Sequence, residues 1–154
     1  MSNPKLELKH KLLAECNRLQ KEIVQTHKTA MQEAQQSAIE SDDNAEDSLM
    51  DSYREEMQNQ RDMYAKQLEH SMDDLNTLSQ VNPDKETEGV SFGSVVITET
   101  QKLFISISLG NVKVGDDAYF AVSPAAPLYK AMAGKKAGET FPFRDKHIKL
   151  IDVF

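Results

Sequence analysis

The sequence predicts an α+β protein, in which a long N-terminal antiparallel helical hairpin precedes a small antiparallel-sheet domain with one short helix. Residues 1–80 contain no Gly and a single Pro, and they are rich in strong helix formers. Residues 81–154 contain all 6 Gly, 4 of the 5 Pro and the dense runs of β-branched residues. The segment Val81-Asn82-Pro83-Asp84 separates the halves, because Pro83 disfavours helix at the residue before it. We therefore expect two domains, 1–80 and 81–154.

Two apolar stripes at helical spacing predict the arms of the hairpin. The first comprises Leu12, Cys16, Leu19, Ile23, Thr26, Ala30, Ala34 and Ala38, and the second Met50, Tyr53, Met57, Tyr64, Leu68, Met72, Leu75 and Leu78. A partner helix normally buries such stripes, and an arm of about 35 residues would be about 50 Å long. The polar stretch 39–47 is long enough for a chain reversal. An intermolecular coiled coil would satisfy the same periodicity.

The second half has the patterns of short strands. We expect strands within 90–98, 102–110, 117–122, 141–143 and 147–154, with one wet and one buried face for 102–110 because its side chains alternate. Residues 127–132 have helical spacing, with Pro127 suited to a first turn and Gly134 to a stop. One short helix on a small sheet gives an α+β domain.

Composition excludes several classes of protein. No stretch approaches the roughly 20 apolar residues of a membrane span, and the N-terminus lacks the apolar run of a secretory signal. One cysteine, Cys16, excludes an internal disulfide and multi-cysteine metal sites, which favours a reducing cytoplasm. The net charge of −7 argues against a protein that coats nucleic acid.

Candidate chemistry concentrates in one acidic stretch. Cys16 lies on the apolar stripe and is expected in the core, and the four histidines (His10, His27, His70 and His147) show no metal-ligand spacing. From Glu40 to Glu56 there are eight acidic residues and one basic residue, Arg54. A solvated hairpin tip explains this charge. Alternatively, the carboxylates meet a cation, and hard oxygen ligands suit Mg²⁺.

Three segments resemble the Gre family of bacterial transcript-cleavage factors. The family's tip motif, Asp-x-x-Glu-Asn-Ala-Glu-Tyr, matches residues 40–47, Glu-Ser-Asp-Asp-Asn-Ala-Glu-Asp. Asn44, Ala45 and Glu46 are kept, the two functional acids are exchanged in type at Glu40 and Asp43, and Asp47 replaces the aromatic residue. Residues 90–96, with their Phe-Gly pair, and residues 122–139 are similar to the family's strand and to its Ser-Pro…Ala-Leu-x-Gly-Lys-x-x-Gly-Asp segment.

The resemblance implies a fold, a partner and roles for particular residues. It implies an FKBP-like second domain that docks on RNA polymerase through Pro127 and Leu128, and a hairpin that enters the secondary channel. Glu40 and Asp43 would then be ligands of a Mg²⁺ shared with the polymerase active site, with Glu46 in a supporting catalytic role. No metal would be bound stably by the protein alone. It implies a monomeric cytoplasmic factor, not itself an enzyme, that stimulates hydrolysis at the RNA 3′ end.

The departures leave alternatives open. Exchanging Asp for Glu moves a carboxylate by about one methylene, and a misplacement of about 1 Å in a catalytic constellation can cost on the order of 10²-fold in rate. A related protein that enters the channel without supporting cleavage is therefore the second hypothesis. A peptidyl-prolyl isomerase and a dimeric coiled-coil scaffold are the remaining ones, the isomerase resting only on fold.

Overall fold

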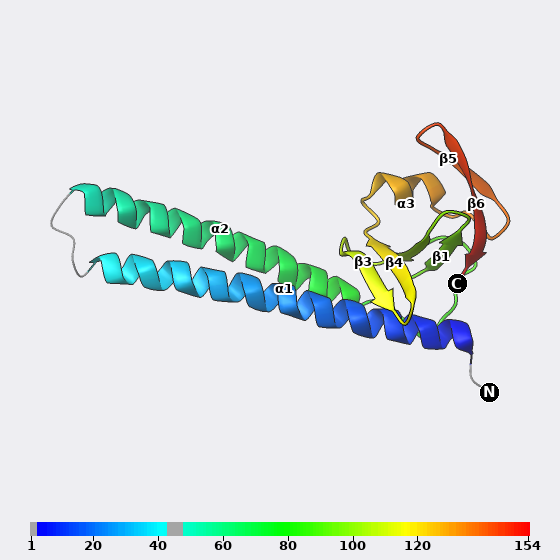
Figure 1. The fold of residues 1–154 in the computed structure, drawn as a ribbon, viewed down its shortest axis with the longest axis horizontal. Helices are drawn as coiled ribbons and strands as arrows, with labels where there is room; N and C mark the ends of the chain where they lie inside the picture. The colour runs from blue at the N-terminus through cyan, green and yellow to red at the C-terminus, as the bar shows by residue number, and fades with distance from the viewer. Residues whose placement is uncertain (1–2, 43–47) are drawn as a thin grey trace. The chain divides into compact units, whose positions relative to one another are not determined.

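A computed structural model of the protein describes the backbone of residues 3–42 and 48–154, and the side chains of residues 3–37 and 51–154. Two long helices, α1 (Pro4–Asp42) and α2 (Ser48–Leu78), form the first part of the chain (Figure 1). Asn3 caps α1, because its Oδ1 accepts the backbone N–H of Lys5 at 3.0 Å. Neither described helix is apolar enough over a sufficient length to cross a membrane.

The remaining elements are six strands and one short helix. They are β1 (Val95–Thr98), β2 (Lys102–Ile105), β3 (Gly110–Val114), β4 (Asp117–Val122), α3 (Pro127–Met132), β5 (Thr140–Phe143) and β6 (Lys146–Val153). The sheet order is β3-β4-β2-β1-β6-β5. The helical hairpin followed by a mostly antiparallel sheet with one short helix confirms the predicted fold class.

Three details of the sheet differ from the sequence prediction. β2 pairs with β4 in parallel, with Leu103 opposite Phe120, so the sheet is mixed. The alternation in 102–110 predicted one wet face, and this was wrong: Phe104 and Ser106 are both 0% exposed. β2 lies between β4 and β1 in the middle of the sheet, and both of its faces are buried. β3 was not predicted as a separate strand.

One apolar core is shared by α3 and one face of the sheet. Its largest buried side chains include Leu103, Ile105, Met132, Phe141 and Leu150. Leu128 and Tyr129 of α3 pack against this cluster. α3 ends before Gly134, whose φ of +77° is a conformation that side chains disfavour, as the predicted stop requires.

Contacts divide the chain into two compact units. One is Leu19–Leu75, the distal parts of both helices, and the other joins the residues up to Arg18 with Asn76–Phe154. Within the second unit, Lys5 at the start of α1 forms an ion pair with Asp152 at 3.1 Å and lies 5.4 Å from the centre of the Phe154 ring. α2 ends at Leu78, before the predicted linker at Val81. The boundary between domains 1–80 and 81–154 stays a prediction.

Candidate functional site

The two helical arms pair with each other in an antiparallel register. Gln20, 3% exposed, donates from Nε2 to the backbone carbonyl of Ser71 at 2.8 Å. Further along the arms, Ala34 and Met57 line the same cavity of about 200 Å³. From the first pair to the second, the residue number rises along α1 and falls along α2. The same chain therefore supplies both arms, as the hairpin alternative predicted.

The seam follows the predicted stripes only in part. Leu12, Cys16 and Leu78 are 0% exposed. Met72 was expected in the second stripe, but it is 53% exposed, and the neighbouring Ser71 is buried instead. Tyr53 is also exposed, at 43%. The Gln20 side chain donates to the Ser71 backbone carbonyl, so the seam contains a polar contact where the predicted stripe had only apolar residues.

The predicted metal ligands lie outside the described residues. Asp43 and Glu46 belong to the undescribed segment 43–47, and Glu40 is in α1 without a described side chain. Their roles stay predictions. In the part of the chain whose side chains are described, no three His, Cys, Asp or Glu residues gather in a possible metal site.

The described end of the acidic stretch lies at the start of α2. Asp51, Glu55 and Glu56 are exposed. Asp51 forms an ion pair with Arg54, its neighbour one turn on, at 3.6 Å. This end of the hairpin is therefore strongly acidic.

The two predicted docking residues occupy the first turn of α3. Pro127 stands at the start of the helix, where its missing N–H costs nothing, and it is exposed. Ala126 before it is extended and donates its backbone N–H to the Ser123 carbonyl at 3.0 Å. Leu128 is half-buried against the core. Pro127 is free to contact a partner, whereas Leu128 also contributes to the fold.

Cys16 and two of the histidines, none of which was assigned to a metal or catalytic site, are buried or hydrogen-bonded. Cys16 is fully buried, and burial, with a smaller contribution from the charge of Glu15, raises the pKa of its thiol to about 12. A thiol in that state is a poor nucleophile. His10 lies 2.6 Å from Asp84, and His27 lies 3.2 Å from Ser71 Oγ, so each has a local hydrogen-bond partner.

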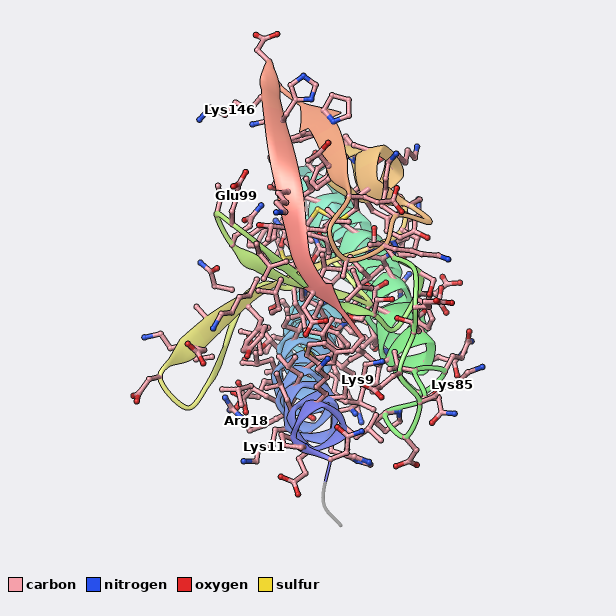
Figure 2. The ribbon with its side chains drawn as sticks, turned by 90° about the vertical axis from the view of Figure 1, so that its right-hand side faces the viewer. Lys9, Lys11, Arg18, Lys85, Glu99 and Lys146 are labelled. Atoms are coloured by element: carbon pink, nitrogen blue, oxygen red, sulfur yellow. The ribbon has the colours of Figure 1, made fainter. Side chains whose placement is uncertain are left out.

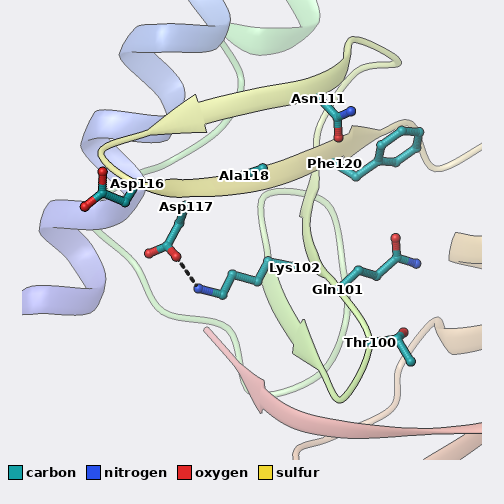
Figure 3. A pocket seen from close by; sticks show the side chains of 8 residues that line it. All are labelled: Thr100, Gln101, Lys102, Asn111, Asp116, Asp117, Ala118 and Phe120. Atoms are coloured by element: carbon teal, nitrogen blue, oxygen red, sulfur yellow. Dashed lines mark ion pairs between the residues drawn. The ribbon is translucent and has the colours of Figure 1, made fainter.

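Sequence reasoning missed a surface cavity of about 360 Å³ on the β2–β4 side of the sheet (Figure 3). Lys102 and Asp117 form an ion pair across it at 3.0 Å, and this hydrogen bond raises the pKa of Lys102. Phe120 lines the cavity and is 40% exposed. Tyr119 and Phe120 are neighbours in the predicted strand 117–122, so their side chains point to opposite faces. The sequence could therefore have indicated one exposed aromatic side chain here.

Sequence reasoning also missed the role of Lys9. Lys9 precedes Leu12 and Cys16 at the spacing of the first apolar stripe, and it is 1% exposed. A lysine at such a position is unusual, because a buried ammonium needs a compensating partner. The spacing alone could have singled it out.

These features define a class of protein: a helical hairpin with a strongly acidic end, joined to a small mixed-sheet domain. No family model and no curated protein matches the sequence. Among solved structures, the chain is similar to the transcription factor Gfh1, with 19% identity and a TM-score of 0.33, over 91% of this chain and 93% of that one.

Proposed function

We propose that this chain is a transcription factor that binds RNA polymerase and, through the acidic end of its hairpin, stimulates cleavage of backtracked transcripts. The observation that carries the proposal is the antiparallel register of the arms. Gln20 contacts Ser71, and Ala34 and Met57 share a cavity further out. That register brings the end of α1 and the start of α2, the two helix ends that flank the Gre-like motif, to the same end of the paired arms.

The proposed chemistry needs carboxylates that a partner's active site can reach. Glu40 and Asp43 would hold a Mg²⁺ ion that is shared with the polymerase, and Glu46 would assist them. Carboxylate oxygens suit this hard cation, which usually takes only one or two of them from a protein. When bound, the metal would activate water for phosphodiester hydrolysis.

The exchanged acids favour a second candidate function. Glu40 and Asp43 stand where the family has Asp and Glu, and Asp47 replaces an aromatic residue. A factor altered in this way would enter the secondary channel and regulate initiation or elongation without supporting cleavage. The two functions share a partner and differ only in the outcome at the RNA 3′ end.

The deciding experiment measures RNA release from stalled, backtracked elongation complexes at fixed Mg²⁺. We expect wild-type protein to accelerate release and Asp43→Ala to lose on the order of 10²-fold of that stimulation. Glu55→Gln is the matched control, since it removes an exposed acid of the same acidic stretch outside the motif. The double exchange Glu40→Asp with Asp43→Glu restores the family pattern and should raise the rate further.

The result also separates the two candidates. Equal release with and without wild-type protein, while it still binds polymerase, would refute the cleavage function and support the non-cleaving regulator. Loss of binding to polymerase altogether would refute both. A mass that doubles with concentration would favour the dimeric scaffold instead.

Docking can be tested without disturbing the fold. Pro127→Ala changes an exposed side chain at the start of α3. We expect weaker binding of this variant to polymerase, measured by competition, with an unchanged unfolding midpoint. Lys130→Ala, an exposed change later in the same helix, is the control. Leu128→Ala is less informative, because Leu128 also packs on the core.

The described cavities give no support to a peptidyl-prolyl isomerase. That activity would require an aromatic-lined pocket. Three cavities of the sheet domain have one aromatic side chain each, from Phe120, Phe92 and Phe143. Four other aromatic side chains of the described residues, Phe104, Tyr119, Phe141 and Phe154, are buried in the interior.

A further inference from the structure

The Lys9 side chain is a buried cation with one short hydrogen bond. Its Nζ donates to the backbone carbonyl oxygen of Lys85 at 2.7 Å, and Lys9 is 1% exposed. An ammonium has three N–H donors, and no other hydrogen bond or ion pair joins this one to the described residues. A neutral carbonyl is a weak counterpart for a buried charge. Two donors are therefore left for another acceptor.

A cavity of about 250 Å³ adjoins this cation within the same compact unit. Its lining carries two lysines and no carboxylate, although the whole chain has a net charge of −7. In Figure 2, Lys9 and Lys85 are on one side of α1, and Lys11 lies away from them. The lining residues are Lys9, Gln80, Asn82, Lys85, Thr87, Ser91, Phe92 and Gly93.

The neutral lining includes two amide side chains, those of Gln80 and Asn82, which carry N–H donors. Asn82 uses its Oδ1 to accept the backbone N–H of Asp84 at 3.0 Å, which leaves its amide N–H groups for a ligand. Gly93, with φ of +90°, brings bare backbone to the wall. Thr87 and Ser91 add hydroxyls that both contact Ser94 Oγ, and the Gln80 amide completes the polar part. A ligand with several acceptor oxygens would match this set.

We propose that this cavity binds a small phosphate-bearing anion, with Lys9 as its buried counter-charge. Lysine commonly binds phosphate as a point charge, and a phosphate has enough acceptor oxygens for the lysines and the Asn82 amide together. The cavity is smaller than the roughly 300–1,000 Å³ of pockets for drug-sized ligands, so it suits a phosphate or a compact phosphate ester. The proposal is independent of the acidic end of the hairpin.

The electrostatics of the cation agree with a missing partner. Burial lowers the pKa of Lys9, and the nearby charge of Glu86 offsets this only in part. Glu86 is exposed and forms no ion pair with Lys9. A bound anion would supply the opposite charge at short range, in a site where water screens it little.

The test titrates the full-length protein with inorganic phosphate at constant ionic strength, set with chloride, and follows backbone amide shifts by NMR. We expect saturable shifts at Asn82, Thr87 and Gly93 with a dissociation constant in the millimolar range or tighter. A parallel titration with a nucleoside monophosphate distinguishes free phosphate from a phosphate ester as the preferred ligand.

Two variants and a control locate the binding. Lys9→Met removes the buried charge and should weaken binding about tenfold or more. Lys85→Met changes an exposed side chain while keeping the carbonyl that Lys9 contacts, so it tests the site even if Lys9→Met fails to fold. Its affinity should fall several-fold. Lys11→Met removes an exposed charge of the same helix and should leave the affinity unchanged.

The outcomes are clear in both directions. Localised, saturable shifts that Lys85→Met weakens and Lys11→Met does not would support the site. Unchanged spectra at the cavity amides, or weak shifts spread over exposed lysines that are equal in all the folded variants, would overturn it.

Discussion

Ser106 is a buried polar side chain whose removal should stabilise the protein. It lies just after β2, is 0% exposed, and its Oγ has no hydrogen-bond partner among the described residues. An unsatisfied buried hydroxyl costs about 1–3 kcal/mol relative to water. Ser106→Ala removes that cost and loses the packing of one oxygen atom. We therefore expect a gain of about 1 kcal/mol in the free energy of unfolding.

Ser94 is the matched control. It is also 0% exposed, but its hydroxyl bonds to Thr87 Oγ1 and accepts the backbone N–H of Ser91 at 3.0 Å. Ser94→Ala leaves those groups without a partner, so it should lower stability by about 1–2 kcal/mol. The same change at two equally buried serines is thus expected to act in opposite directions.

Urea unfolding followed by circular dichroism measures both effects. An unchanged slope with a higher midpoint for Ser106→Ala would indicate a true change in stability. A gain of 1 kcal/mol corresponds to a melting temperature higher by about 2–4 °C for a chain of this size. A lower midpoint for Ser106→Ala would refute the reasoning, because it would mean that the hydroxyl has a partner, such as a buried water.

Three further predictions concern a turn, the seam and the thiol. The β5–β6 turn holds Arg144 and Asp145 at φ of +50° and +63°, so Asp145→Gly should raise the free energy of unfolding by about 0.5–1 kcal/mol, measured by urea denaturation. A decrease would contradict the strain. Met72→Gln should change stability by less than about 0.5 kcal/mol, and Ser71→Gln should cost more than about 1 kcal/mol by denaturation, because only Ser71 is buried. Cys16 should resist alkylation at pH 8 until the protein unfolds. The free energy of unfolding should fall as pH rises from about 9 towards 12, because the Cys16 thiol loses its proton at lower pH in the unfolded chain than in the folded one.

Local features of the sequence determined most of the elements. The spacing of Leu12 and Cys16 placed a buried face on the first helix, and both side chains are fully buried. Pro127 and Gly134 marked the start and stop of α3, because one lacks an N–H and the other tolerates a positive φ. Such constraints act over a few residues, so they can be recognised without knowing the rest of the fold.

Contacts between residues far apart in the sequence could not be predicted from the sequence pattern. The alternation in 102–110 indicated one wet face, but Phe104 and Ser106, on the face expected to be wet, are both 0% exposed. Pairing of β2 with β4 in parallel depends on where the chain crosses over, which no local pattern encodes. At the seam Ser71 is buried and Met72 is exposed, and Gln20 donates to the Ser71 carbonyl.

For the candidate sites, too, the sequence determined some features and the tertiary structure decided others. The sequence by itself determined the acidic stretch and its position between two helices, because charge and periodicity are local properties. The tertiary structure decided that the arms pair within one chain and that Lys9 adjoins a cavity with Lys85, a residue far along the sequence. Burial of a charge depends on what the folded chain brings around it, and that is the physical reason why only the structure reveals the Lys9 cavity.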